Sequence, residues 1–291
     1  MKAVKLELLV AAPVAAALSL LLATAAWAAF DLEPVGPAER GCAVRVALMG
    51  FGEGFQRGVA DGSGLTDSSA ALGGRSARAA SVSIYGFRPF GVSGIDFAAV
   101  SARFPVGAPG NCLGIGYGRL EAPGYLEHTY LVSAGIGAGC AVIRPAVQLG
   151  AVIAEGAFAD WAALAGISAA AAVSSDIRVA AEVHNFLGLG LMREGSRCPR
   201  RLCVGLGVRA SPGLRFGIEA AKSAGAPTCF RSGVEWEAAR AIALRAGLGT
   251  SPKEFAVGVG LRLGRVVLDA ASSVNLDLGA THEAGLTVLW E

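Results

Sequence analysis

The stretch EFAVGVGLRLG, residues 254–264, alternates between two kinds of side chain. Odd positions from Phe255 to Leu263 hold large apolar residues, while the even positions hold mainly glycine, alanine and arginine. Such period-two alternation places successive side chains on opposite faces of a β-strand. The solvent face of a soluble sheet normally carries Lys, Glu and Thr. The glycines on the second face therefore indicate surroundings other than open water.

The composition is typical of a membrane protein. Of the 291 residues, 53% are hydrophobic and 16% are charged, whereas roughly 25% are charged in soluble domains. After residue 28 no stretch provides the about 18 uninterrupted apolar residues of a spanning helix. Polar residues interrupt the most apolar region: Arg144, Gln148, Glu155, Asp160 and Asp176. The remaining structure that a bilayer tolerates is a closed β-barrel. A net charge of +2 indicates no nucleic-acid partner.

The first 78 residues differ from the rest. Residues 1–28 contain two lysines, an apolar run and the small-residue pattern Ala26-Trp27-Ala28, which together predict a cleaved signal peptide. An uncleaved membrane anchor is the alternative. Residues 29–78 are rich in turn residues and include one plausible strand, Cys42 to Met49. This N-terminal segment is expected to form a luminal plug or a periplasmic cap, or else a solvated linker.

Period-two segments recur through residues 79–291, which we predict to be a transmembrane antiparallel β-barrel of about fourteen strands, with twelve to sixteen as the range. The expected strands are 79–87, 93–104, 111–120, 127–138, 141–153, 162–173, 177–186, 200–210, 213–222, 228–236, 240–249, 253–263, 265–273 and 281–290. Connections should be short at the periplasmic end and longer at the external end, for example EAPGYLE at 121–127.

The last sixty residues contain a recognisable series of motifs: LRAG at 244–247, GVGLRLG at 258–264, Asp269, and LGATH at 278–282. This series resembles the closing strands of the FadL-like barrels of the PorV/PorQ type. The resemblance implies a fourteen-stranded barrel in the outer membrane of a Gram-negative-type bacterium. FadL-type members pass hydrophobic compounds, and PorV-type members serve protein secretion or surface attachment. The Asn-Pro-Ala-Gly turn usual before the first strand is replaced here by TDSSAALGGRSA at 66–77.

Charged residues of both signs are expected to line the lumen: Arg178, Glu182, Arg209, Arg215, Glu219, Arg231, Glu235, Arg245, Arg262, Asp269 and Glu283. Mixed signs on neighbouring strands favour cross-strand ion pairs. A selectivity filter, which usually gathers one sign at a constriction, is the alternative. Arg262 is expected to reach Asp269 on the following strand or the neighbours of Arg245 on the preceding one.

One external loop combines basic residues with cysteines. Its arginines are Arg193, Arg197, Arg200 and Arg201. They could bind phosphates of lipopolysaccharide, or the loop could simply be solvated. Cys198 and Cys203 bracket PRRL and are the best disulfide candidates among the six cysteines of an exported chain. No Cys-x-x-Cys motif is present, so no metal site is expected.

Neither an enzyme nor a cofactor is expected. His184 is the only histidine that the alternation places on the inner face of its strand. No serine lies in a sequence pattern that would pair it with this histidine as a nucleophile. The glycine-rich strings GIGYG and GVGLRLG fall within strands, not in phosphate-binding strand-to-helix loops. A transport channel for small, apolar molecules is therefore the first functional hypothesis. A closed structural or secretion-associated barrel that binds partner proteins is the second, and a secreted soluble β-protein is a third.

Overall fold

The computed structural model describes residues 80–107, 112–135, 143–156, 160–172, 174, 176–184, 200–223, 225–250 and 253–290. The expected signal peptide (1–28) and the N-terminal segment (29–78) lie outside these ranges and stay predictions. Within the described part of the chain, no helix is both long and apolar enough to span a membrane.

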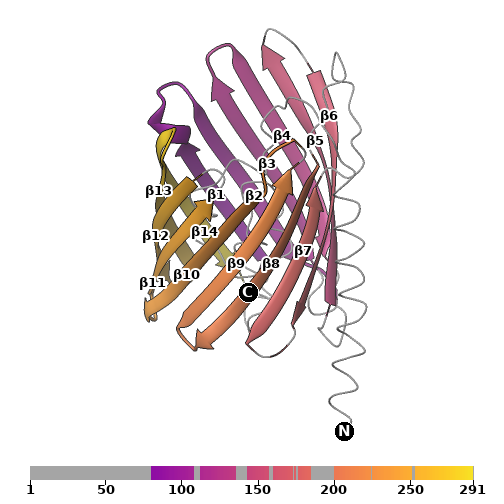
Figure 1. Cartoon of the computed structure of the whole chain (residues 1–291). Helices are drawn as coiled ribbons and strands as arrows, with labels where there is room; N and C mark the ends of the chain where they lie inside the picture. Colours follow the sequence, from indigo (N-terminus) through magenta and orange to yellow (C-terminus); the bar gives the residue numbers. More distant parts are fainter. Residues whose placement is uncertain are drawn as a thin grey trace.

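Fourteen antiparallel strands, built from the described residues, form one closed barrel with tilted strands (Figure 1). They are β1 (Ala80–Arg88), β2 (Asp96–Pro105), β3 (Cys112–Ala122), β4 (Tyr125–Gly135), β5 (Ile143–Gly156), β6 (Asp160–Ala172), β7 (Ile177–His184), β8 (Arg201–Ser211), β9 (Leu214–Ser223), β10 (Cys229–Ala239), β11 (Ile242–Thr250), β12 (Lys253–Leu263), β13 (Val266–Asn275) and β14 (Gly279–Trp290). The predicted fold class is confirmed.

The barrel closes between its first and last strands. The β1–β14 ladder runs from the pair Ala80 and Trp290 to the pair Arg88 and His282. All remaining strand pairs join strands that are consecutive in sequence. Closure satisfies the backbone hydrogen-bonding groups of strands that would otherwise form exposed edges.

The two ends of the barrel differ less in loop length than expected. We call the end with the two-residue turns 212–213, 240–241 and 264–265 the turn end, and the opposite end the loop end. At the loop end, the stretch 121–127 forms no long loop. Instead, β3 and β4 remain paired as far as Ala122 and Tyr125, because Gly124 adopts a φ of +72° that permits a tight turn after Pro123.

Side chains alternate between an exposed apolar face and a buried face. Large apolar residues remain exposed on the outer wall, among them Ile84, Phe216, Ile218, Leu248, Phe255 and Leu263. Between them, β9, β10, β11 and β12 bury alternate residues that point into the barrel. An apolar outer wall around a polar and small-residue interior is characteristic of transmembrane barrels.

An aromatic cluster lies on the outer wall of β3 and β4. The Tyr117 hydroxyl and His128 Nδ1 are 2.8 Å apart and hydrogen-bonded. The ring of Tyr130 lies 5.3 Å from that of Tyr117 between centroids. Tyrosine combines an apolar ring with a polar hydroxyl, and here the hydroxyl of Tyr117 is satisfied by His128 on the neighbouring strand.

Candidate lumen site

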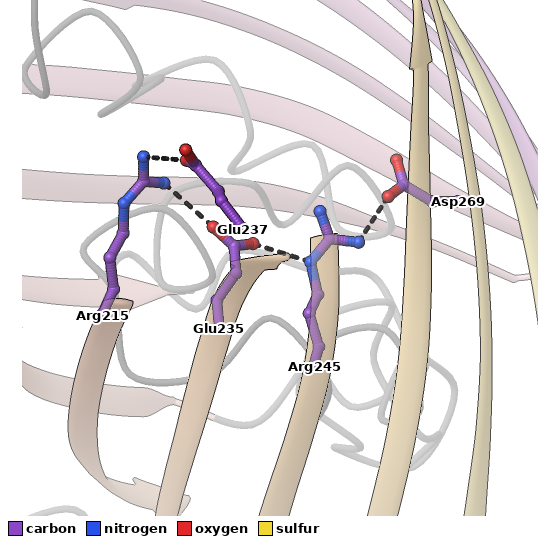
Figure 2. A network of polar contacts seen from close by, with 5 residues as sticks. All are labelled: Arg215, Glu235, Glu237, Arg245 and Asp269. Carbon is purple, nitrogen blue, oxygen red and sulfur yellow. Dashed lines mark hydrogen bonds and ion pairs between the residues drawn. The ribbon is translucent and has the colours of Figure 1, made fainter. Parts of the chain in front are cut away.

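A charged row crosses the inner wall towards the turn end. Glu235 of β10 lies directly opposite Arg215 of β9 on one side and Arg245 of β11 on the other. Its two carboxylate oxygens accept hydrogen bonds from both arginines, at 2.9 Å from Arg215 Nη1 and 2.7 Å from Arg245 Nε (Figure 2). One buried carboxylate thus joins three strands.

Two further carboxylates complete this network. Arg215 Nη2 donates to Glu237 Oε1 at 2.6 Å, and Arg245 Nη1 donates to Asp269 Oδ1 at 2.5 Å. Asp269 belongs to β13, two strands away from Arg245, and Gly260 of β12 lies between them. A Cβ on Gly260 would stand 2.8 Å from Asp269 Oδ1 and 2.9 Å from Arg245 Nη2. The glycine therefore leaves the space through which the two charges meet.

This arrangement corrects one expectation. Arg262 lies beside the turn 264–265, opposite Val267, and is exposed. The expected contact with Asp269 is not formed. Arg245 occupies the space over Gly260 and takes the Asp269 carboxylate instead.

A second row lies nearer the loop end. Arg231 Nη1 donates to Glu219 Oε1 at 3.2 Å, and both side chains are buried. In register with this pair, Gly249 follows on β11, Glu254 on β12 and Asn275 on β13. The two charged rows therefore run parallel around the inner wall of β9 to β13.

A stripe of small residues separates the two charged rows. Direct register aligns one residue from each strand from β8 to β14. The members of this small-residue stripe are Gly207, Gly217, Gly233, Gly247, Ala256, Ser273 and Thr281. The side chains of the stripe are short, and Ala256, Ser273 and Thr281 are at most 6% exposed, so this part of the inner wall is covered.

An apolar row lies on the inner wall of β1, β2 and β3. Phe87, Phe97 and Leu120 are direct neighbours on β1, β2 and β3, and the phenylalanine ring centroids are 4.8 Å apart. Glu283 of β14 and Glu127 of β4 end this row on either side, both buried. Tyr125 donates a hydrogen bond of 2.7 Å from its hydroxyl to Glu127 Oε2. Sequence reasoning missed Glu127 because the strand was expected to begin there.

Of the other predicted lumen and loop residues, the structure describes only some. Arg209 of β8 lies opposite Arg215 and is half-buried. Arg178 and Glu182 belong to β7, but their side chains lie outside the described part. Arg193, Arg197 and Cys198 also lie outside the described residues. Arg200 is exposed just before β8, and Arg201 begins that strand.

Two cysteines, Cys203 of β8 and Cys229 of β10, lie near the loop end. Cys203 is buried against Ala221 and Cys229, which lie on successive strands. Because Cys198 lies outside the described residues, its pairing with Cys203 stays a prediction. Among the residues that the structure places, no group of three His, Cys, Asp or Glu side chains could hold a metal ion.

Comparisons with known proteins give the fold. No model of a protein family matches the sequence, and no curated protein matches it. The fold is similar to that of TodX. A mutant of this monoaromatic hydrocarbon channel superposes with a TM-score of 0.58 at 8% identity, over 89% of this chain and 98% of that one. Mutants of the Rhodopseudomonas blastica porin match at a TM-score of 0.40 and 8% identity, over 73% of this chain and 99% of theirs. At such identities the likeness to TodX shows a common fold alone.

Proposed function

We propose that this chain is an outer-membrane channel of a Gram-negative-type bacterium that admits small, apolar molecules. The observation that carries the proposal is a closed barrel of fourteen described strands with an apolar outer wall and a stripe of small residues inside. Barrels of eight strands are just filled by their side chains, and wider ones can leave a passage. The similar fold of TodX, a monoaromatic hydrocarbon channel, supports the same class of cargo.

The polar groups of the lumen fit an uncharged cargo. Arg215, Arg231 and Arg245 each donate to a carboxylate of the inner wall. A filter that selects ions usually presents a ring of one sign. Here, charges of opposite sign are paired across neighbouring strands, so the wall produces no strong electrostatic field along the pore.

Uptake of a small hydrocarbon tests the proposal. The chain would be expressed in a Gram-negative host whose lipopolysaccharide slows entry of radiolabelled toluene, and its insertion checked by heat-modifiable gel mobility. We expect faster toluene uptake than in the empty host. The double variant Gly233→Trp with Gly247→Trp, which fills the small-residue stripe, should return uptake towards the background. Equal uptake with and without the inserted barrel would contradict the channel.

A closed barrel of the PorV type is the second candidate. It would be shut by residues 29–78 and would bind secretion-system proteins through the connection between β7 and β8. The burial of Ala256, 0% exposed on the inward face, favours this candidate, because an open pore would expose a wall residue of this size. Crosslinking in membranes should then recover a specific partner, and deletion of residues 191–199 should abolish the crosslink. Absence of any crosslinked partner argues against it.

Lipopolysaccharide is a proposed partner in either case. Arg200 is exposed at the start of β8, and Arg201 follows it. Guanidinium groups bind phosphate oxygens through charge-assisted hydrogen bonds. Replacement of both arginines by glutamate should weaken lipopolysaccharide binding by the purified barrel, and unchanged binding would leave only a solvated loop.

A further inference from the structure

Two arginines occupy tight turns at the turn end of the barrel. Arg240 belongs to the turn between β10 and β11, Arg265 belongs to the turn between β12 and β13, and both are exposed. Among the described residues, neither guanidinium forms an ion pair. The carboxylates nearest to them along the same strands, Glu237 of β10 and Asp269 of β13, already accept hydrogen bonds from other arginines. These turns therefore carry positive charge that no described carboxylate balances.

Backbone hydrogen bonds fix the positions of these two turns. The carbonyl of Ala241 accepts from the N–H of Arg262 on β12, and the carbonyl of Arg265 accepts from the N–H of Leu289 on β14, both at 2.8 Å. Each turn is thus bonded to the strand that follows its hairpin. The two arginines consequently belong to one continuous stretch of the rim, over β10 to β14.

The apolar outer wall reaches this stretch of the rim. Trp236 of β10 and Trp290, the last residue of β14, are 53% and 43% exposed. Leu263, which directly precedes the turn that contains Arg265, is 60% exposed. Tryptophan in transmembrane proteins is enriched where lipid meets water. The ends of these strands are therefore the natural place for the membrane boundary, with the two turns on its aqueous side.

Positive charge at this boundary favours phosphate. A guanidinium binds phosphate oxygens through charge-assisted hydrogen bonds, and basic residues beside a bilayer are attracted to its anionic lipids. Because Arg240 and Arg265 serve no described carboxylate, such binding breaks no existing ion pair. An acidic protein would also supply negative charge. The adjoining apolar wall favours a lipid instead, since it offers acyl chains a surface directly below the headgroup.

We propose that Arg240 and Arg265 bind the headgroup phosphates of anionic phospholipids in the leaflet at the turn end. The short turns of bacterial barrels face the periplasm, so this is the inner leaflet of the proposed outer membrane. The acyl chains lie along the outer wall of β10 to β14, which brings the phosphates beside the two turns. The inference goes beyond the proposed function, because it requires a barrel in a membrane but no particular cargo.

Native mass spectrometry of the full chain, released from non-ionic detergent micelles, tests this surface. The probes are palmitoyl-oleoyl phosphatidylglycerol and palmitoyl-oleoyl phosphatidylcholine, which share their acyl chains and differ in headgroup charge. We expect the wild-type barrel to bind phosphatidylglycerol more tightly, by about fivefold or more. The double variant Arg240→Gln with Arg265→Gln should weaken phosphatidylglycerol binding about tenfold or more, because each basic residue at a membrane surface contributes about fivefold.

A second double variant, Arg262→Gln with Lys253→Gln, provides the matched control. It removes the same number of positive charges, one from the lumen face of β12 beside the turn end and one from the loop end of the same strand. Phosphatidylglycerol binding should stay at the wild-type value in this variant. All four side chains are exposed, so both double variants should fold normally, as checked by heat-modifiable gel mobility.

Three results would overturn the lipid surface: equal affinity of the wild type for the two lipids, unchanged affinity in the Arg240 and Arg265 variant, or an equal loss in the control variant. Two soluble probes identify other sources of negative charge. Displacement of the lipid by an equal concentration of sn-glycerol 3-phosphate would show that the arginines bind phosphate without a membrane. Arginine-dependent binding of polyglutamate, without a preference for phosphatidylglycerol, would show a surface for an acidic protein. Either result rejects the lipid surface. Toluene uptake involves neither arginine, so the channel proposal and this one can fail separately.

Discussion

Arg245 on β11 meets Asp269 on β13 across the backbone of Gly260, so an ion pair of the inner wall passes over an entire strand. Cross-strand pairs ordinarily join adjacent strands. Here Glu235 holds the other side of the same guanidinium, and the three charged groups tie β10, β11 and β13 together (Figure 2). The glycine is therefore a structural requirement of the network.

Gly260→Val should separate this pair. The added side chain begins 2.8 Å from Asp269 Oδ1, closer than real Cβ contacts, and displaces the Arg245 guanidinium. Because the displaced atoms are ends of flexible side chains, we expect the cost to come from the separated ion pair, about 2 kcal/mol in unfolding free energy, measured by urea titration in lipid vesicles. Ala270→Val, which adds volume to the exposed outer face of β13, should have little effect. Equal losses in the two variants would show that the passage over Gly260 is unimportant.

Glu235 and Glu237 should differ strongly when neutralised. Glu235→Gln removes the shared partner of two arginines from a side chain that is 5% exposed. The expected cost is about 3 kcal/mol, near the low end for a broken buried ion pair, because each arginine keeps a second carboxylate. Glu237 is 43% exposed on its side chain, so Glu237→Gln should cost below about 1 kcal/mol. Urea titration of both variants checks the order, and a reversed order would contradict the network.

Phe90 should be tolerant of glycine. It adopts a φ of +53° in the short 3-10 turn η6 (Pro89–Gly91), a left-handed conformation that costs non-glycine residues energy. Its backbone N–H donates to Thr281 Oγ1 at 2.8 Å, which fixes the turn on β14. Phe90→Gly should leave the barrel as stable as wild type or up to about 1 kcal/mol more stable. Phe90→Val should destabilise it in the same assay, and a stable valine variant would refute the strain.

A charge on the outer wall tests the membrane environment. Ile218 lies within β9 and is 56% exposed on the apolar face. In a bilayer, Ile218→Arg should cost about 2–4 kcal/mol if the residue lies near the midplane. Val92→Arg, in the connection between β1 and β2, is exposed to a similar extent and should cost almost nothing. Refolding yield and urea stability in vesicles measure both, and equal stability of the two variants would argue against a lipid-facing wall.

The faces of the strands were predictable from sequence because alternation is a local property. Large residues such as Phe255 and small ones such as Gly258 mark the two faces of β12 wherever that strand lies. The same alternation correctly placed the side chains of Glu235, Arg245 and Asp269 on the inner face of the barrel. The length of the turns was less predictable, since Gly124 converted an expected loop into a two-residue connection.

By itself, then, the sequence determined a β-barrel of about fourteen strands with an apolar outer wall, since period-two alternation and the absence of spanning helices need no long-range information. Only the tertiary structure decided which charges meet. The choice of Arg245 over Arg262 as partner of Asp269 and the alignment of seven small residues into one stripe both depend on strand register. The register of each hairpin is set by its turn, and a shift of two residues at one turn would preserve both faces while changing every partner across that hairpin.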